Sequence, residues 1–199
     1  MNKFERQYNL FNDNELIFSE KNPLNELNID KNIIKQWQRK ILSHQTPIFK
    51  KGFKNINQPS FFDSSNEKST ETFNPEVLTP QPLSFWRWPK TMHAGPAVYF
   101  VMDYIDNLNE SIILYIGETV SAEHRWKGEH DCKNYLSNYS EILQKANVPT
   151  NLNIRFWLDV PPSTRERRKL EQKLIQIWLP PFNKETRGIW STPFTSQIN

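Results

Sequence analysis

Cysteine is nearly absent from this chain of 199 residues, in which Cys132 is the one example. A single cysteine cannot form an intrachain disulfide or hold a thiolate zinc site alone, so we expect a reducing, cytoplasmic environment. No apolar run approaches the ~18 residues that cross a bilayer, and the first residues carry scattered charges where a signal peptide would be apolar. We therefore expect a soluble protein without a membrane partner, while its oligomeric state stays open.

Several enzyme signatures are missing as well. The chain has no G-x-x-x-x-G-K-[ST] phosphate loop, no G-x-G-x-x-G dinucleotide turn, no H-E-x-x-H zinc helix and no G-x-S-x-G nucleophile turn. These absences argue against nucleotide hydrolases, dinucleotide-dependent enzymes, zinc proteases and serine hydrolases. The net charge is only +3, so overall charge by itself indicates no partner.

Glycine is scarce too: the chain has five glycines against fourteen prolines, and many of the prolines lie between residues 23 and 96. The stretch from Pro47 to Pro82 is also rich in Ser and Asn, which is typical of loops. We therefore divide the chain into an N-terminal extension, residues 1–90, and a compact domain, residues 91–199. The extension is a wrapping arm that covers the other domain's core, a DNA-contacting segment or a flexible linker.

Basic residues gather in part of this extension. Residues 31–54 hold seven basic side chains and no acidic one. Apolar spacing predicts a helix over residues 31–42 with Asp30 as its cap, and Lys31, Lys35 and Arg39 would share one face of it. Such a face can contact the phosphate backbone of a nucleic acid or can simply be solvated. A second basic cluster spans residues 165–173.

The second half of the chain has a clearer pattern of elements. β-branched and aromatic residues predict a hairpin of strands 97–105 and 111–118 around a turn at 106–109. A helical tendency over residues 120–146, interrupted at Gly128, is followed by an alternating strand over 151–160. A helix over 163–178 would begin at Ser163 in a capping box and end before Pro180. This order predicts an α+β fold with a small antiparallel three-stranded sheet flanked by helices.

Five polar residues fall where this layout can bring them together. Tyr99 and Tyr115 lie on the two hairpin strands, and one residue from each strand can project from the same face. Arg125 follows Tyr115 by ten residues, and Asn183 follows Glu171 by twelve. An acid at Glu171, on the flank of an apolar helix stripe, is costly unless it is paired or binds a metal.

These residues resemble the motifs of the GIY-YIG nucleases. Ala97-Val98-Tyr99 matches the family's Gly-Ile-Tyr with Ala in place of Gly, and Tyr115-Ile116-Gly117 matches Tyr-Ile-Gly without change. The family's Arg falls on Arg125, and its Glu followed twelve residues later by Asn falls on Glu171 and Asn183. The resemblance covers residues 95–185 and implies a DNA endonuclease that depends on Mg²⁺ or Mn²⁺.

The resemblance also implies a role for each matched residue. Glu171 would be the metal ligand, because a hard carboxylate oxygen suits Mg²⁺. Arg125 would grip the scissile phosphate, and Tyr99 would act as general base with Tyr115 beside the same phosphate. Asn183 would brace the Glu171 helix. Some members place a His four residues after the Arg; this chain has Glu129 there, so the neighbouring His130 is an added candidate. Lys127 is another, because its positive charge could help to lower the pKa of Tyr99.

Each of these residues also has a purely structural reading. Glu171 could pair with a neighbouring arginine of its own helix (Arg167 or Arg168), and Arg125 could pair with Glu129. Either tyrosine could be a core aromatic, and His130 could face solvent. A non-catalytic nucleic-acid-binding or structural module on the same fold is thus the alternative to a nuclease.

Overall fold

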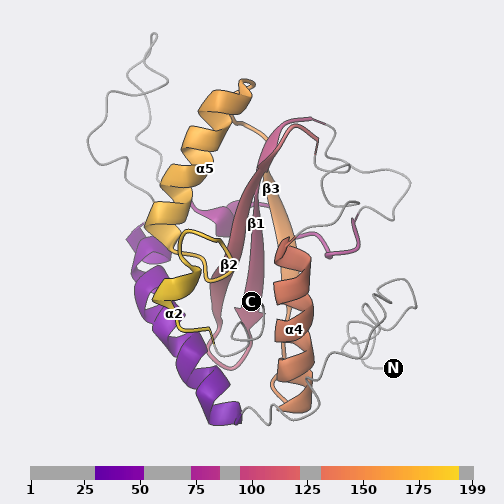
Figure 1. The fold of residues 1–199 in the computed structure, drawn as a ribbon, viewed down its shortest axis with the longest axis vertical. Coiled ribbons are helices and arrows are strands. Elements are labelled where there is room, and N and C mark those ends of the chain that lie inside the picture. The colour runs from indigo at the N-terminus through magenta and orange to yellow at the C-terminus, as the bar shows by residue number, and fades with distance from the viewer. Residues whose placement is uncertain (1–29, 52–72, 86–94, 122–130, 193–199) are drawn as a thin grey trace.

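The computed structural model describes residues 30–51, 73–85, 95–121 and 131–192 of the chain. Its elements are α2 (Lys31–Lys51), η1 (Pro75–Val77), β1 (Ala97–Ile105), β2 (Glu110–Thr119), α4 (Asp131–Lys145), β3 (Leu152–Trp157), α5 (Thr164–Trp178) and η3 (Arg187–Ile189). The strands form one antiparallel sheet in the order β2-β1-β3, with helices around it (Figure 1). The predicted α+β class is confirmed. No helix within the described ranges is long and apolar enough to cross a membrane.

Most of the predicted helices and strands are present, but several begin or end at other residues than predicted. The helix predicted over 31–42 continues to Lys51, and its cap is confirmed because Asp30 accepts the Asn32 N–H at 3.0 Å. The strand predicted over 151–160 stops at Trp157, so Leu158 is 46% exposed and does not face the core as alternation suggested. Of the helical tendency over 120–146, α4 accounts for residues 131–145, and residues 122–130 lie outside the described residues.

The predicted capping box at the start of α5 is wrong. Ser163 occupies the N-cap position, but its side chain makes no capping hydrogen bond. The first turn is held by Arg167 instead, whose guanidinium donates to the Pro161 and Pro162 carbonyls and to the Thr164 hydroxyl. The buried guanidinium therefore ties the first turn of α5 to the loop before it, but as a donor it cannot satisfy the N–H groups that a serine cap would accept from.

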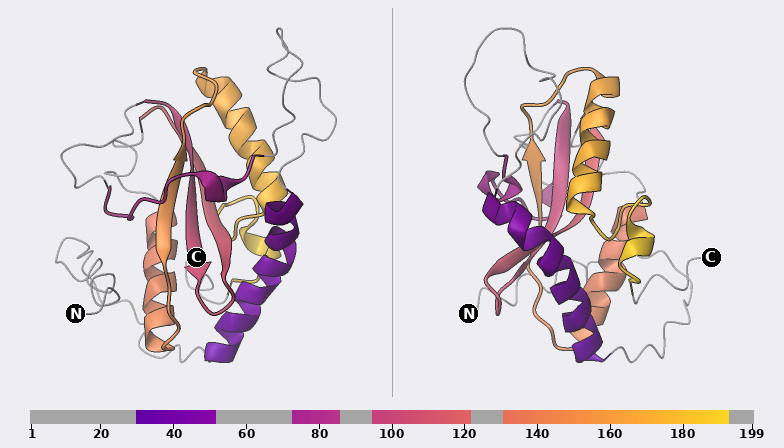
Figure 2. Two further views of the ribbon diagram at one scale, coloured as in Figure 1. Left: turned by 180° about the vertical axis from the view of Figure 1, so that it is seen from behind. Right: turned by 90° about the vertical axis from the view of Figure 1, so that its left-hand side faces the viewer.

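The sheet separates two apolar clusters. One face, with Ala97, Tyr99 and Val101 of β1, packs against α4 and the first half of α2. The other face, with Val98, Phe100 and Met102 of β1, packs against α5. This strict alternation along β1 is what a strand covered on both sides requires. Figure 2 shows the sheet between these helices from two further directions.

Helix α2 closes the open side of β2. Its Gln45 accepts the Ile113 N–H at 2.7 Å and donates to the Ile113 carbonyl at 3.1 Å. Asn183 does the same for Ile116, accepting its N–H at 3.0 Å and donating to its carbonyl at 2.8 Å. Two side-chain amides thus satisfy backbone groups that would otherwise be available to another chain.

The other edge of the sheet, on β3, is covered by residues 73–85. Gln81 and Ile154 exchange backbone hydrogen bonds of 2.8 and 2.9 Å. The Arg155 guanidinium donates to the Leu78 carbonyl at 3.0 Å, and the Phe73 ring stacks on Trp157 at 4.0 Å. Both described parts of the N-terminal extension, residues 30–51 and 73–85, therefore pack directly against the sheet.

A buried polar network joins α2, α4 and β1 near the hairpin turn. Asp103, with no exposed surface, accepts hydrogen bonds from the Tyr139 hydroxyl at 2.7 Å, the Asn151 N–H at 2.7 Å and the Thr150 hydroxyl at 3.0 Å. Gln38 donates to the Tyr139 oxygen at 2.8 Å. Burial raises the pKa of the Asp103 carboxyl to about 6, although the three hydrogen bonds lower it.

Candidate active site

A β-bulge places the two tyrosines on one face of the sheet. The pairing of β1 with β2 shifts between Val101, which faces Tyr115, and Met102, which faces Ile113, so that Leu114 is an extra residue. With unshifted pairing Tyr115 would project from the opposite face, because successive side chains alternate. The structure instead holds the Tyr99 and Tyr115 rings roughly parallel, with centroids 6.0 Å apart.

Gly117 makes room for this pair. It lies directly opposite Tyr99 in the sheet. A Cβ at this position would lie under 3.0 Å from ring atoms of both Tyr99 and Tyr115, closer than real Cβ atoms come to their neighbours. The third residue of the Tyr-Ile-Gly motif is therefore required by the close approach of the two rings, and its backbone has no positive φ that would demand glycine.

The two tyrosines differ in exposure. Tyr99 is 1% exposed and belongs to the apolar cluster on its face of the sheet, where its ring lies 6.0 Å from that of Phe156. Tyr115 is only partly buried against the same cluster. Tyr115 therefore offers surface to a ligand, whereas Tyr99 is largely enclosed.

Glu171 reaches the end of β2 from the middle of α5. Its carboxylate accepts the Glu118 N–H at 3.1 Å, one residue beyond Gly117. Burial raises the pKa of the Glu171 carboxyl to about 7; the Glu118 N–H lowers it, and the charges of Glu118 and Glu185 raise it. A half-buried carboxylate with one backbone donor and acidic neighbours is a position where a cation would be bound favourably.

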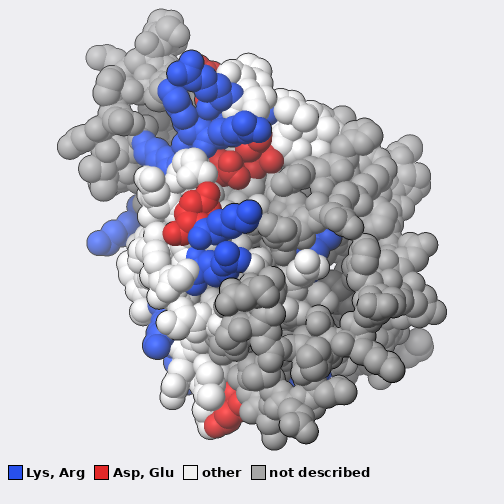
Figure 3. All heavy atoms as spheres, viewed as in Figure 1, with Lys and Arg blue, Asp and Glu red and all other residues white. Residues whose placement is uncertain are grey.

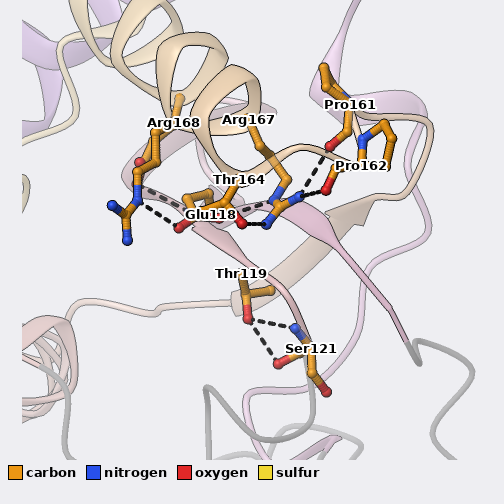
Figure 4. A network of polar contacts seen from close by, with 9 residues as sticks. Glu118, Thr119, Ser121, Pro161, Pro162, Thr164, Arg167 and Arg168 are labelled. Carbon is orange, nitrogen blue, oxygen red and sulfur yellow. Dashed lines mark hydrogen bonds and ion pairs between the residues drawn. The ribbon is translucent and has the colours of Figure 1, made fainter.

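Neither Arg167 nor Arg168 forms an ion pair with Glu171, although the positive charge of Arg168 lowers the pKa of the Glu171 carboxyl. Arg167, with no exposed surface, donates to the Glu118 carboxylate at 3.0 Å, and Arg168 contacts the other oxygen of that carboxylate at 3.3 Å. Figure 4 shows Glu118 between the two guanidinium groups. The ion pair that would have made Glu171 a purely structural acid is formed by Glu118, so the Glu171 carboxylate keeps acceptor capacity for a ligand.

Asn183 has a different role from the one that the sequence suggested. Its side chain does not brace the Glu171 helix, because both side-chain hydrogen bonds go to Ile116. The amide is buried, with 4% of its surface exposed. Asn183 therefore fixes the backbone of β2 between Tyr115 and Gly117, and it does not present itself to a substrate.

The structure does not place the remaining predicted residues at this site. Arg125, Lys127 and His130 lie outside the described residues. The three basic residues of α2 belong to its first half, where Lys31 donates to the Asn147 carbonyl just after α4. The neighbouring Thr150 and Asn151 bind Asp103, near the Ile105 end of β1, whereas Tyr99 is near the Ala97 end.

The predicted role of Glu171 as a metal ligand fits the chemistry of its surroundings. In the described ranges no three His, Cys, Asp or Glu side chains form a ready-made metal cage. Mg²⁺ does not need one, since it commonly keeps several waters and binds through one or two carboxylates together with substrate phosphates. Glu171 can supply such an oxygen, and Mn²⁺ accepts the same ligands.

Sequence reasoning missed three residues that shape the site. Glu118 follows the Tyr-Ile-Gly motif directly and binds two of the three arginines of α5, Arg167 and Arg168. Arg167 belongs to the basic cluster over residues 165–173, although it is fully buried. Gln45 is buried on α2 and holds Ile113 next to the bulge. A polar residue on an otherwise apolar helix face was the available signal for Gln45.

Comparison of the chain with family models, with curated proteins and with solved structures finds no match.

Proposed function

We propose that the chain is a metal-dependent endonuclease that hydrolyses phosphodiester bonds in DNA, with Mg²⁺ or Mn²⁺ as its cofactor. The observation that carries this proposal is that three groups lie around two neighbouring residues of β2, Gly117 and Glu118. The rings of Tyr99 and Tyr115 meet over Gly117. The Glu171 carboxylate bonds the next N–H along the strand. Two phenols and an acid with spare acceptor capacity at the same end of β2 form a reasonable setting for phosphate chemistry.

Phosphodiester hydrolysis needs a deprotonated water, compensation of the charge on the phosphate oxygens and help for the leaving oxygen. Glu171 would hold the divalent ion, which supplies positive charge and acidifies water when bound. A tyrosine in its phenolate form would take a proton from the attacking water, becoming a neutral hydroxyl. Since an ordinary tyrosine pKa is ~10, this role needs positive charge close by. Arg125 would supply charge and grip the phosphate.

The direct test is cleavage by the full chain. Plasmid, linear, branched and single-stranded DNA, and RNA, are each incubated with the protein in Mg²⁺, in Mn²⁺ and in a chelator, and the ends are mapped. We expect metal-dependent cuts in DNA with 5′-phosphate ends. Cutting at the same rate in chelator would reject the metal, and no cutting of any substrate would reject the nuclease.

One observation favours the second candidate, a non-catalytic nucleic-acid-binding or structural module. Tyr99 is 1% exposed, so its ring offers almost no surface to a substrate. Tyr99→Phe and Tyr115→Phe separate the two candidates, because each keeps the ring and removes one hydroxyl. If both tyrosines act on phosphate, each variant lowers the cleavage rate by ~10²-fold or more. If both variants cleave at the parental rate, the two tyrosines serve only to pack the core.

A further inference from the structure

The solvent side of α5 carries basic residues in its first two turns. Arg165, Arg168 and Lys169 are exposed there, and the intervening acid on this stretch is Glu166. Figure 3 shows Lys and Arg side chains gathered over the end of α5 where the helix begins, with acidic side chains beside them. The fourth basic residue of this stretch, Arg167, is buried and contributes nothing to the surface.

This basic patch, defined as Arg165, Arg168 and Lys169, borders the candidate active site. Arg168 lies three residues before Glu171, which on a helix places the two side chains on neighbouring turns of one face. The Nε of Arg168 contacts the Glu118 carboxylate, yet the side chain remains 69% exposed. Figure 4 shows its terminal nitrogens pointing away from Glu118. The guanidinium therefore has donors available on its outer side.

The basic residues of α2 are placed less well for the same task. The Lys31 ammonium donates to the Asn147 carbonyl, and Lys35 is partly buried. Both lie near the end of the sheet where the hairpin turns. Tyr99 is six residues from that end of β1, which corresponds to about 20 Å along a strand. A nucleic acid bound at Glu171 would need an extended path to meet Lys31 and Lys35.

We propose that the basic patch on α5 binds the phosphate backbone of a nucleic acid beside the active site, and that it contributes more to affinity than the basic face of α2. The identity of the partner rests on the proposed function. Two planar guanidinium groups suit phosphate oxygens because they offer paired donors, and a guanidinium is weakly hydrated. Arg165 and Arg168 are also near enough to repel each other, which an adjacent polyanion would relieve.

The test measures binding in the absence of cleavage. The full chain carrying Glu171→Gln is titrated with a fluorescein-labelled DNA duplex at several salt concentrations. Each phosphate contact contributes about 0.9 to the slope of log K against log salt. The patch variant Arg165→Gln/Arg168→Gln/Lys169→Gln should flatten this slope by ~2 to 3 and weaken binding to all sequences alike. The comparison variant Lys31→Gln/Lys35→Gln/Arg39→Gln removes the same charge and should flatten it by ~1 or less.

Two further measurements keep the outcome decisive. Arg165→Gln alone does not touch Glu118, so a loss of about 0.9 in slope for this variant excludes an indirect effect through the ion pairs. Vesicles rich in phosphatidylserine test the other common polyanion. The inference fails if the patch variant keeps the parental slope, if the α2 variant loses more, or if vesicles bind while DNA does not. Failure of cleavage with the slopes as expected would instead reject the nuclease and keep the binding surface.

Discussion

Asp103 and Glu171 are both carboxyl groups taken out of water, yet their surroundings differ at the two ends of the sheet. Asp103 is enclosed and receives three hydrogen bonds, which use its acceptor capacity. Glu171 is half-buried, receives one backbone hydrogen bond and has acids for neighbours. Burial raises the pKa of both. The number and kind of hydrogen-bond donors around a carboxylate therefore distinguish a structural acid from an acid that can accept a cation. Burial alone does not distinguish them.

The largest expected effect comes from exchanging each acid for its amide. Glu171→Gln should lower the cleavage rate by ~10³-fold, because it removes the metal-binding oxygen charge that stabilises the reacting phosphate. Asp103→Asn is the matched control and should leave the rate per folded molecule close to the parental one. Rates are measured on the DNA substrate that the parent cuts best. A Glu171→Gln protein that cuts at the parental rate would show that Glu171, like Asp103, takes no part in cleavage.

The next effect concerns stability against pH. Because the folded pKa of Asp103 is raised from 3.8 to about 6, the folded state binds more protons than the unfolded state between those values. The contribution of Asp103 is therefore fully present below pH 4 and is lost as the pH rises through about 6, by ~3 kcal/mol in total.

The measurement is denaturant unfolding of the parent and Asp103→Asn from pH 4 to pH 7. The parent should lose stability relative to the variant over this range, since the amide does not titrate. A constant difference between the two proteins would mean that the three hydrogen bonds to Asp103 outweigh its burial and keep it ionised throughout.

A smaller effect on stability is expected from a substitution at the end of the sheet near Glu171. Gly117→Ala places a Cβ against the rings of Tyr99 and Tyr115, and one of them must move, which should cost ~1–3 kcal/mol of stability. The clash is mainly with Tyr99, so the same substitution should cost less in a Tyr99→Leu background. Thermal or denaturant unfolding of the four proteins of this double-mutant cycle measures the coupling. Additive effects would contradict the close approach of Gly117 and Tyr99.

The smallest effect is expected at the start of α5. Ser163→Ala should change stability by less than ~0.5 kcal/mol, because the serine side chain caps nothing in the structure. A loss of ~1 kcal/mol or more in denaturant unfolding would restore the capping box that the sequence suggested, and would weaken the assignment of this turn to Arg167.

The sequence predicts the elements of this protein well because their signals are local. β1 is a run of β-branched and aromatic residues and is found with its predicted ends. The order of strands and helices also follows from such runs. The predictions for Leu158 and Ser163 are wrong, and both rest on local spacing alone. The strand ends at Trp157, before Leu158, and the Ser163 side chain makes no capping hydrogen bond.

The candidate site could be predicted only in part. Two tyrosines on adjacent strands and an acid on a later helix are visible in the sequence. The bulge at Leu114 is not, and the common face of the tyrosines depends on it. The sequence also cannot tell which acid forms ion pairs with Arg167 and Arg168. Glu118 and Glu171 are 53 residues apart in the chain and lie side by side only in the folded protein. Because the two arginines pair with Glu118, the Glu171 carboxylate is the one that can accept a ligand.

The side-chain amide of Gln45 has a consequence for how the chain folds during synthesis. Its partners Ile113 and Trp178 lie 68 and 133 residues further along the chain. On a ribosome, α2 is therefore made long before the strand and helix that it must hold together. Contacts of such sequence separation form slowly, because a large loop has to close first. Helix α2 must wait, with its apolar side uncovered, until α5 has emerged, and this interval is when the nascent chain is most exposed to misassociation.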